Sequence, residues 1–382
     1  MGVLARVYPP GLVDEVVASA GRLERRRRLL PARVVLYYVL ALALFSEGSY
    51  EEVMRQLLEG LAWGAGEEEG AWEVPSKAAI FRARKRLGVE PLRLLFESAA
   101  RPLATEATRG AFYRGLRLLS LDGTCLDVAD SLENAGAFGR PGSSRREGGG
   151  AYPQLRMVGL CECGTHAVVD AALGPYTVSE RRLAEELLPR LEVGTLVLAD
   201  RGLIGFERFR IARERGAELL WRAQSDMRLP RQRELGDGSF LSRLQPPRKS
   251  RAAPQPVRVI EYRLDDAAEA QSYRLITTLL DPERAPAGEL AALYAQRWEL
   301  ETALDELKTH QRGPRVVLRS KTPEGAYQEA YGYLLTHYAI RRVMHDAALA
   351  ADLDPDRLSF LRSLRAARRS ARASTGFSPH DA

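Results

Sequence analysis

The stretch between residues 116 and 221 constrains the fold most strongly, because apolar segments of strand length alternate there with segments of helical period. Turn residues separate these segments, as is typical of short strands and the helices between them. The predicted strands are 116–121, 155–161, 167–172, 195–199 and 218–221, and the predicted helices are 180–191 and 206–215. Three strands followed by a helix, a strand, a helix and a strand predict a mixed α/β sheet that is covered by helices.

Two of the predicted strands run directly into an aspartate. Asp122 begins an Asp-Gly-Thr sequence, and Asp200 begins Asp-Arg-Gly after a fully apolar strand. In open α/β sheets, ligands bind outside the carboxyl ends of the strands, so the two carboxylates are candidates for one site. Either aspartate alone is a weak indication, because Asp is common in turns.

A helix predicted over residues 294–308 carries four polar residues on one side. At 3.6 residues per turn, its polar residues fall close to a single stripe, which consists of Tyr294, Arg297, Glu301 and Lys308. Arg and Lys hold phosphate oxygens, Glu binds divalent cations and Tyr donates to phosphate. Taken alone, the stripe is more simply a solvated helix face with ion pairs between neighbouring turns, so its meaning depends on the rest of the chain.

The two strand-end aspartates and the glutamate of the polar stripe form a candidate catalytic set. Asp122, Asp200 and Glu301 come from separate elements and can converge where the sheet edge meets the helix, where they would bind one or two Mg²⁺ ions. Two metal ions about 4 Å apart can activate a water or a 3′-OH and stabilise the leaving oxygen of a phosphodiester. The carboxylates that compete with this set are Asp127, Asp226, Glu299 and Glu306.

Basic segments lie on both sides of the predicted catalytic elements. Before them, two predicted helices, 49–58 and 77–87, suggest a helix-turn-helix-like unit. The basic residues of its second helix are Arg82, Arg84, Lys85 and Arg86. After them, residues 222–258 hold nine basic and three acidic side chains within a β-rich insertion predicted over 222–280. A solvated structural face explains the helix equally well, whereas the concentrated charge of the insertion favours contact with a polyanion.

Composition limits the setting in which the chain works. The 382 residues carry a net charge of +6 and a pI of about 9.3, which favours an anionic partner. Three cysteines without zinc spacing suit a reducing, cytoplasmic environment. The apolar stretch 34–45 is too short to span a bilayer and predicts a buried helix, so no membrane partner is expected.

The motifs together resemble a known family. The order Asp122-Gly-Thr, Asp200-Arg-Gly and Tyr294-x2-Arg297-x3-Glu301-x6-Lys308 is similar to that of the DDE transposases of the insertion-sequence-4 family, whose Tyr-Arg-Glu-Lys spacing is complete here. The basic run 25–28 and the helix start at 75–77 also look like the family's N-terminal domain. The resemblance implies a ribonuclease-H-like mixed sheet flanked by helices, with a β-rich insertion between the second Asp and the Glu and an N-terminal helical domain.

The resemblance also implies a domain order and roles for the motif residues. We expect an N-terminal helical DNA-binding domain at 1–105, a catalytic domain at 106–309 and a C-terminal helical segment at 310–382. Asp122, Asp200 and Glu301 would be the catalytic metal ligands. Tyr294, Arg297 and Lys308 would contact phosphates near the transposon end. Trp298 could stack on an extruded base, although a buried core tryptophan is the simpler expectation.

The resulting functional hypothesis is a cut-and-paste DNA transposase. It would bind terminal inverted repeats as a homodimer on double-stranded DNA, cleave with Mg²⁺, for which Mn²⁺ can substitute, and transfer the strand to target DNA. A bacterial cytoplasmic location, on the nucleoid when bound to DNA, is expected. The alternatives are a DNA-binding regulator without catalysis and a structure-selective nuclease on the same fold. A regulator that only binds DNA does not need three buried acids, which argues against it. The nuclease would cleave DNA without joining strands.

Overall fold

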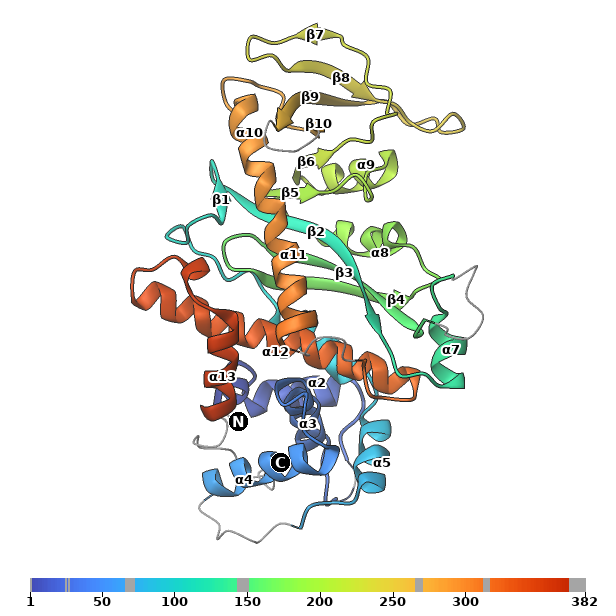
Figure 1. Cartoon of the computed structure of the whole chain (residues 1–382), viewed down its shortest axis with the longest axis vertical. Coiled ribbons are helices and arrows are strands. Elements are labelled where there is room, and N and C mark those ends of the chain that lie inside the picture. The colour runs from blue at the N-terminus through green and yellow to red at the C-terminus, as the bar shows by residue number, and fades with distance from the viewer. Residues whose placement is uncertain are drawn as a thin grey trace.

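A ten-stranded mixed sheet forms the centre of the computed structural model (Figure 1). The structure describes residues 2–24, 26, 28–65, 73–142, 151–264, 271–311 and 317–370. The strands are β1 (Phe112–Tyr113), β2 (Leu116–Asp127), β3 (Gln154–Glu162), β4 (Ala167–Pro175), β5 (Thr195–Ala199), β6 (Glu218–Arg222), β7 (Arg233–Glu234), β8 (Phe240–Leu244), β9 (Gln255–Leu264) and β10 (Gln271–Thr277). They lie in the order β4-β3-β2-β5-β6-β10-β9-β8-β7, with β1 beside β2. Only the β2–β5 and β5–β6 pairs among them are parallel, so the predicted mixed sheet is confirmed.

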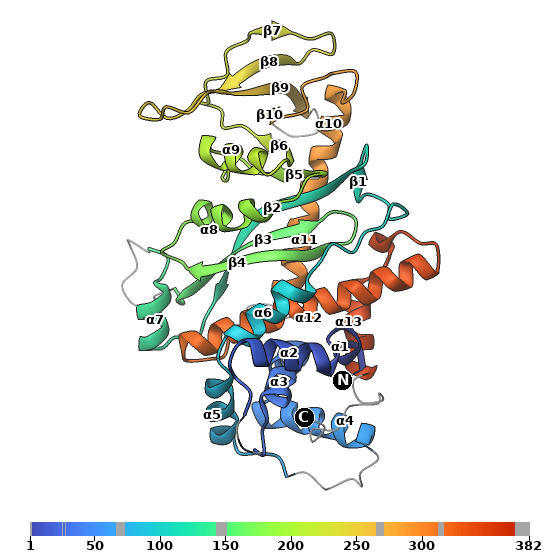
Figure 2. The same ribbon diagram turned by 180° about the vertical axis from the view of Figure 1, so that it is seen from behind.

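Helices cover both faces of this sheet (Figures 1 and 2). The apolar strand β5 explains why, since all five of its residues are buried and successive side chains point to opposite faces. Val197 lies in the core that includes helices α8 (Glu180–Leu187) and α9 (Phe206–Glu214). Leu198 lies in the core that includes α10 (Ala287–Tyr294). The two layers leave the carboxyl ends of β5 and β6 beside the segment that follows α10.

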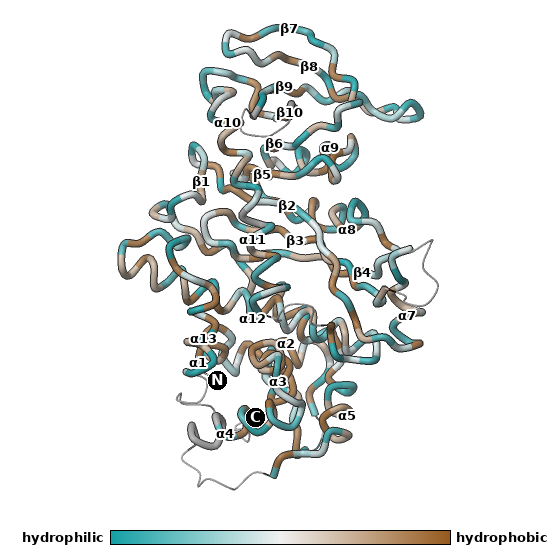
Figure 3. The backbone as a smooth tube through the Cα atoms, viewed as in Figure 1, coloured by the Kyte–Doolittle hydropathy of each residue, from teal (hydrophilic) through white to brown (hydrophobic). Residues whose placement is uncertain are grey.

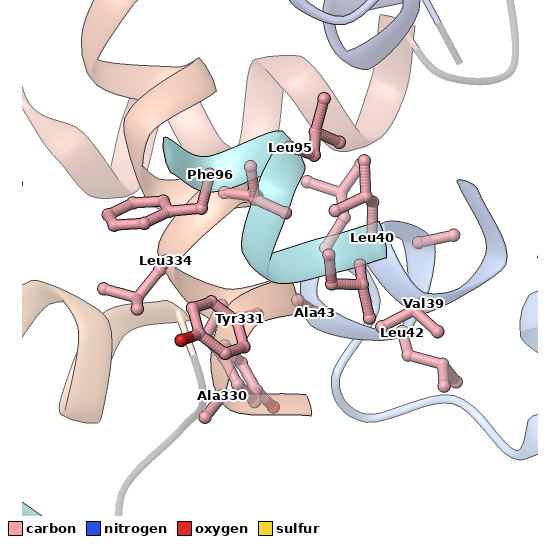
Figure 4. Packing of buried hydrophobic residues seen from close by; sticks show 14 of the residues in the cluster. Val39, Leu40, Leu42, Ala43, Leu95, Phe96, Ala330, Tyr331 and Leu334 are labelled. Carbon is pink, nitrogen blue, oxygen red and sulfur yellow. The ribbon is translucent and has the colours of Figure 1, made fainter. Parts of the chain in front are cut away.

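The helices at the two ends of the chain share one hydrophobic core. They are α1 (Gly2–Val7), α2 (Pro10–Ser19), α3 (Ala32–Leu44), α4 (Tyr50–Ala65), α5 (Lys77–Leu87) and α6 (Glu90–Ala99), together with α12 (Pro323–Ala350) and α13 (Phe360–Ser370). Figure 4 shows side chains of α3, α6 and α12 in contact, among them Leu40, Phe96 and Tyr331. Helices α3 and α12 approach so closely that a Cβ at Gly332 would lie 3.0 Å from the carbonyl oxygen of Val39.

Helix α3 is the apolar stretch that was predicted to be buried. Each of its thirteen residues is buried, and it is one of the most apolar segments of the backbone in Figure 3. Among the described residues, no helix combines the length and the apolar character that crossing a bilayer requires.

The second helix of the predicted helix-turn-helix-like unit is also present. Ser76 accepts a hydrogen bond from the backbone N–H of Ala79 and caps α5, and Gly88, at φ +72°, follows its end. One of its basic residues is structural, because Arg84 is buried and donates to the Gln328 side chain of α12 at 3.0 Å. Arg82, Lys85 and Arg86 remain exposed. Two residues of the basic run, Arg25 and Arg27, lie outside the described residues.

Two local predictions were wrong. Strand β2 does not end before Asp122 but continues to Asp127, because its pairing with β3 extends to Asp127 opposite Gln154. The helix predicted over 294–308 is not continuous either. A 3₁₀ turn (Ala295–Arg297) follows α10, and α11 (Trp298–Asp305) passes into a π-helical segment (Glu306–Gln311). The π-helical segment includes residues 310 and 311, with which the predicted C-terminal segment begins, and residues 312–316 lie outside the described residues.

The insertion is β-rich as predicted, but its charge is not all on the surface. Arg258 of β9 is fully buried. Its guanidinium donates hydrogen bonds to Asp237 and to the carbonyl oxygen of Ala285, which compensate for the loss of water. Arg231 is exposed, but it pairs with Glu234 and Glu261. The prediction that the nine basic side chains form one basic surface is thus wrong for Arg258.

A buried ion pair joins the π-helical segment to α12. Arg341 donates two hydrogen bonds to the carboxylate of Glu306, one of them from Nε at 3.0 Å, and His337 Nε2 lies 3.2 Å from the same carboxylate. Burial alone raises the pKa of Glu306, but the hydrogen bond from His337 and the charge of Arg341 hold this pKa below its ordinary value. Burial lowers the pKa of His337. Glu306 is therefore an ionised structural group.

Replacing Glu306 should destabilise the whole chain. We expect Glu306→Ala to lower the free energy of unfolding by about 3–5 kcal/mol, because it leaves the buried guanidinium of Arg341 without its counter-charge. Urea denaturation followed by circular dichroism measures this change. The control is Glu52→Ala, which removes an exposed ion pair with Arg55 and should cost less than about 1 kcal/mol. Equal losses in the two variants would contradict the assignment.

Candidate active site

The register of two parallel strands places the two aspartates beside each other. Leu121 of β2 pairs with Ala199 of β5, so the next residue of each strand, Asp122 and Asp200, stands at the same level of the sheet. Neighbouring strands lie about 4.8 Å apart. The two carboxylates therefore belong to one edge of the sheet, although only β5 ends there.

The segment from α10 to α11 runs across one face of the sheet, from β9 to β3, and passes over β2 (Figure 1). The hydroxyl of Ser120 on β2 donates a hydrogen bond to the carbonyl oxygen of Arg297 at 3.3 Å. Arg297 and Tyr294 are both buried, with 6% and 5% of their surfaces exposed. The polar stripe predicted from the spacing therefore faces the sheet at Tyr294 and Arg297, and the interpretation as a purely solvated helix face is wrong there.

Arg297 and Tyr294 connect the three candidate carboxylates. Nη1 of Arg297 lies 2.8 Å from Oε1 of Glu301 and 3.4 Å from Oδ2 of Asp122. The hydroxyl of Tyr294 donates to the carbonyl oxygen of Ala199 at 3.3 Å and lies 3.5 Å from Oδ1 of Asp200. Arg297 thus joins Asp122 to Glu301, and Tyr294 joins Asp200 to the same segment.

Burial and like charges act against ionised Asp122. Burial is the largest cause that raises the pKa of its carboxyl, and the nearby charges of Glu301 and Glu180 raise this pKa further. The backbone N–H of Gly123, at 2.8 Å, and the guanidinium of Arg297 only partly offset these effects. Asp122 is therefore a carboxylate that additional positive charge would stabilise.

Arg297 supplies the positive charge that is present. Burial lowers the pKa of its guanidinium, but Tyr294, Glu301 and Asp200 outweigh burial and raise this pKa above its ordinary value. For Tyr294 burial has the opposite effect. It raises the pKa of the phenol, which therefore stays protonated. The site therefore combines a permanent cation and a neutral hydrogen-bond donor with the three carboxyl groups.

The donor atoms of this site suit a divalent cation. All three candidate ligands are carboxylates, and hard cations such as Mg²⁺ bind carboxylate oxygens. In the conformation described, no three His, Cys, Asp or Glu side chains among the described residues stand close enough together to hold a metal ion. Arg297 instead lies within 3.4 Å of both Asp122 and Glu301. The argument for a metal ion at this site is that all three candidate ligands are carboxylates and that Arg297 does not fully offset the effects that raise the pKa of Asp122.

Two of the predicted DNA contacts lie outside this cluster. Lys308 is in the π-helical segment and is half-buried. Burial raises the pKa of the Cys125 thiol on β2, and the charge of Lys308 is among the effects that lower this pKa. Trp298 is 60% exposed beside the guanidinium of Arg297, which lies 5.3 Å from its ring. The simpler expectation of a buried core tryptophan was therefore wrong.

The competing carboxylates have other surroundings. Asp127 accepts a hydrogen bond from Gln154 at 2.8 Å, five residues further along β2 than Asp122. Glu306 is held in the buried ion pair with Arg341. Asp226 is exposed in a turn after β6, and the side chain of Glu299 lies outside what the structure describes.

Sequence reasoning missed two residues of the site. Nη1 of Arg222, the last residue of β6, lies 3.9 Å from Oδ1 of Asp200, and its guanidinium stacks 4.2 Å from the ring of Tyr273. The charge of Glu180, the first residue of α8, acts on Asp122. Arg222 could have been predicted as a site residue, because it ends the apolar strand β6 beside β5. The sequence analysis counted it only among the basic residues of the insertion.

Comparisons with known proteins agree with this architecture. Residues 1–97 match the family model for the N-terminal region of insertion element 4 transposases, and residues 113–338 match the transposase DDE domain. The transposase InsG for insertion sequence element IS4 of Escherichia coli K12 is 29% identical over 377 residues, which cover 97% of this chain and 83% of InsG. InsZ of the same organism is 26% identical over 199 residues, which cover 52% of this chain and 63% of InsZ.

The fold is also similar to that of a solved structure. That structure is the piggyBac transposase in a synaptic complex with hairpin DNA, with a TM-score of 0.52 and 12% sequence identity. The match covers 98% of this chain and 80% of that chain. Together with the mixed sheet and the match to the DDE domain, it identifies the fold as ribonuclease-H-like.

Divalent cations should stabilise the protein through the aspartates of this site. Ligand at a hundredfold excess over its dissociation constant adds about 2.7 kcal/mol to the stability of the folded state. We therefore expect Mg²⁺ or Mn²⁺ to raise the melting temperature of the wild type by a few degrees and to raise that of Asp122→Asn or Asp200→Asn much less. Asp226→Asn, which removes an exposed carboxylate, is the control and should keep the full shift. The same shift in all variants would exclude these ligands.

Proposed function

Because this chain belongs to the insertion-sequence-4 family of DDE transposases, which are metal-dependent DNA-transposing enzymes, we propose that it moves its own element by a cut-and-paste reaction. It would bind the terminal inverted repeats, cleave the DNA at the ends of the element and transfer the freed strands to target DNA. The family model for the DDE domain covers the sheet and the Glu301 helix together, which supports placing the chemistry at their junction.

The proposed chemistry begins with a first nick and ends with strand transfer, the second strand is processed between these steps, and the nick and the transfer share one geometry. In the nick, a water attacks a phosphorus at the end of the element, and the bond from that phosphorus to the 3′ oxygen breaks, which leaves a 3′-OH and a 5′-phosphate. In the transfer, this 3′-OH attacks a phosphorus of the target, and the bond to the target's own 3′ oxygen breaks. One phosphodiester replaces another in the transfer, so no external energy source is needed.

We assign the metal-ligand role to Asp122, Asp200 and Glu301. Mg²⁺, or Mn²⁺ in its place, would make a bound water more acidic and stabilise the leaving oxygen. The observation that carries the assignment is the convergence of the three carboxylates on Arg297 and Tyr294. No protein nucleophile is required for either step.

We assign phosphate contacts near the transposon end to Tyr294, Arg297 and Lys308. The charged guanidinium of Arg297 and the protonated phenol of Tyr294 already stand at the sheet edge over which the scissile phosphate would lie. Lys308 lies in the π-helical segment, where its charge influences Cys125 of β2, and it would contact the DNA strand away from the reacting phosphate. Trp298, exposed next to Arg297, would stack on an extruded base.

We also propose an oligomeric state, roles for the three segments of the chain and a cellular location. Two ends must be paired before they are joined to a target, so a homodimer on double-stranded DNA is the smallest competent complex. The helical domain 1–105 would hold the ends, the domain 106–309 would cut them, and the segment 310–382 would support both. The reaction would take place in the bacterial cytoplasm, on the nucleoid.

Loss of one aspartate should abolish cleavage without abolishing DNA binding. We expect Asp200→Ala to nick end-containing DNA at least about a thousandfold more slowly than wild type, because it removes several kcal/mol of transition-state stabilisation at 1.36 kcal/mol per decade. EDTA should stop the wild-type reaction in the same way. Nicking is measured on labelled duplexes, and gel shifts on the same duplexes report binding.

Three outcomes separate the proposal from its alternatives. Asp226→Asn is the control and should cleave like wild type. Nicking by Asp200→Ala at the wild-type rate would refute the metal-ligand role. Specific binding without any Mg²⁺-dependent cleavage would identify the regulator, and cleavage without strand joining would identify the nuclease.

Trp298 should matter after the first nick rather than before it. Base–aromatic stacking contributes about 1–3 kcal/mol per base, so Trp298→Ala should slow second-strand processing by roughly 5- to 150-fold and leave the first nick unchanged. A fluorescent base analogue at the end of the element reports whether a base leaves the stack. Trp298→Phe keeps a ring and should retain most of the signal. If the first nick is slowed as much as later steps, Trp298 has another role.

A further inference from the structure

The three candidate ligands are held in place in different ways. Asp122 lies inside β2, which continues to pair with β3 beyond it, and Glu301 lies inside α11. Asp200 follows Ala199, the last residue of β5 that pairs with β2 and β6. Because the sheet no longer fixes the backbone at Asp200, the position of its carboxylate depends on the loop that follows, residues 201–205.

Three side chains donate hydrogen bonds to the backbone carbonyl groups of this loop. They are Arg181 of α8, which donates to Gly202 at 2.8 Å, Gln224, which follows β6 and donates to Arg201 at 3.3 Å, and Arg208 of α9. Arg208 holds two carbonyl oxygens, that of Leu203 from Nε at 2.7 Å and that of Ile204 from Nη2 at 2.8 Å. Leu203 and Ile204 are buried, and buried carbonyl groups need partners within the protein.

Leu203 connects Arg208 to Asp200. The carbonyl oxygen of Leu203 accepts from Arg208, and its backbone N–H donates to the carbonyl oxygen of Asp200 at 3.1 Å. A displacement of the guanidinium therefore moves the residue that closes the turn at Asp200. Replacing a group that orients a metal ligand lowers the affinity for the metal by about 10- to 100-fold.

Arg208 is itself fixed by its surroundings. Its side chain is 12% exposed, and Nη1 lies 3.1 Å from Oε1 of Glu185 on α8, which lies beside α9 in Figures 1 and 2. Gly205 leaves room for the guanidinium, since a Cβ at this position would clash with Nη2 of Arg208 and lie 2.8 Å from its Cζ. The backbone of Gly205 is extended, at φ 175°, so the close approach of Arg208 is what excludes a larger side chain there.

We propose that Arg208 is a positioning residue for Asp200, which holds the loop after β5 so that the Asp200 carboxylate faces the same metal ions as Asp122 and Glu301. Arg208 contacts neither DNA nor metal and acts through the backbone of Leu203. The inference rests on the proposed function in one respect, namely that Asp200 is a metal ligand. A residue that only stabilised the fold would leave the metal affinity of the folded protein unchanged, and this difference can be measured.

The test measures the affinity of the full-length protein for Mn²⁺. Titration followed by the electron paramagnetic resonance signal of the free ion gives the dissociation constant, and nicking of an end-containing duplex gives the Mn²⁺ concentration for half of the maximal rate. We expect Arg208→Gln to raise both values by about 10- to 100-fold. Arg208→Lys keeps the charge but loses the planar guanidinium that donates to two carbonyl groups, so it should show a smaller increase.

The matched control is Arg210→Gln on the same helix. Arg210 pairs with Glu207 and Glu214, and within the described part of the chain it donates no hydrogen bond to the loop. Both Mn²⁺ values should therefore stay at those of the wild type.

Gly205→Ala displaces the guanidinium of Arg208 and leaves its charge in place. The added methyl meets the far end of a flexible side chain, which can move away, so the fold should persist while the hydrogen bonds to the loop are lost. This variant should raise both Mn²⁺ values by a similar factor to Arg208→Gln. Its control is Gly136→Ala in α7 (Leu132–Phe138), where an added Cβ meets none of the described residues within 4 Å.

The outcomes separate positioning from support of the fold and from the proposed function itself. If Arg208→Gln and Gly205→Ala lower the melting temperature in EDTA but leave both Mn²⁺ values unchanged, Arg208 only stabilises the fold and the proposal is overturned. Loss of end-duplex binding in EDTA by Arg208→Gln would show a contact with DNA and would overturn it as well. A wild type without Mn²⁺-dependent nicking would instead refute the proposed function, whatever the variants do.

Discussion

Three carboxylates at one edge of a sheet repel one another, and the charge of Arg297 is what allows them to stay together. Its guanidinium is buried, lies within 3.4 Å of both Asp122 and Glu301, and remains protonated because the surrounding acids outweigh the cost of burial. Removing either side of such an arrangement leaves a buried charge without a partner, which is far less favourable than breaking an exposed pair. The site is thus held together by the same electrostatics that make it receptive to further cations.

The segment that carries Glu301 is fixed at both ends by ion pairs of the same kind. Where α10 begins, Asp237 accepts hydrogen bonds from the buried Arg258 and from the backbone N–H of Ala287. Beyond α11, the π-helical segment places Glu306 against Arg341 of α12. The insertion sheet and the helical body therefore both position the helix that carries Glu301, although neither contributes one of the three candidate ligands. Such support explains how a helix interrupted by 3₁₀ and π turns can still present Tyr294, Arg297 and Glu301 to one strand edge.

The order of strands and helices, the mixed sheet and the buried helix α3 could be predicted from the sequence, because each depends on local apolar periodicity. Other features depend on partners that are distant in the chain. Strand β2 passes beyond Asp122 because β3 continues to pair with it, and no local turn signal reveals this. Which arginines are buried is equally non-local, since Arg84 meets Gln328 and Arg258 meets Ala285 only after folding. The contact between Arg222 and Asp200 was missed for the same reason.

Several arginines of this chain are buried structural groups, and this limits what net charge can reveal. Among the described residues, five arginines are buried, namely Arg33, Arg84, Arg258, Arg297 and Arg341, and each has a carboxylate partner within 4 Å. A planar guanidinium suits that role because it can satisfy several acceptors at once and stays charged when it is buried. Counting basic residues therefore overstates the surface that is available to DNA, as it did for the insertion.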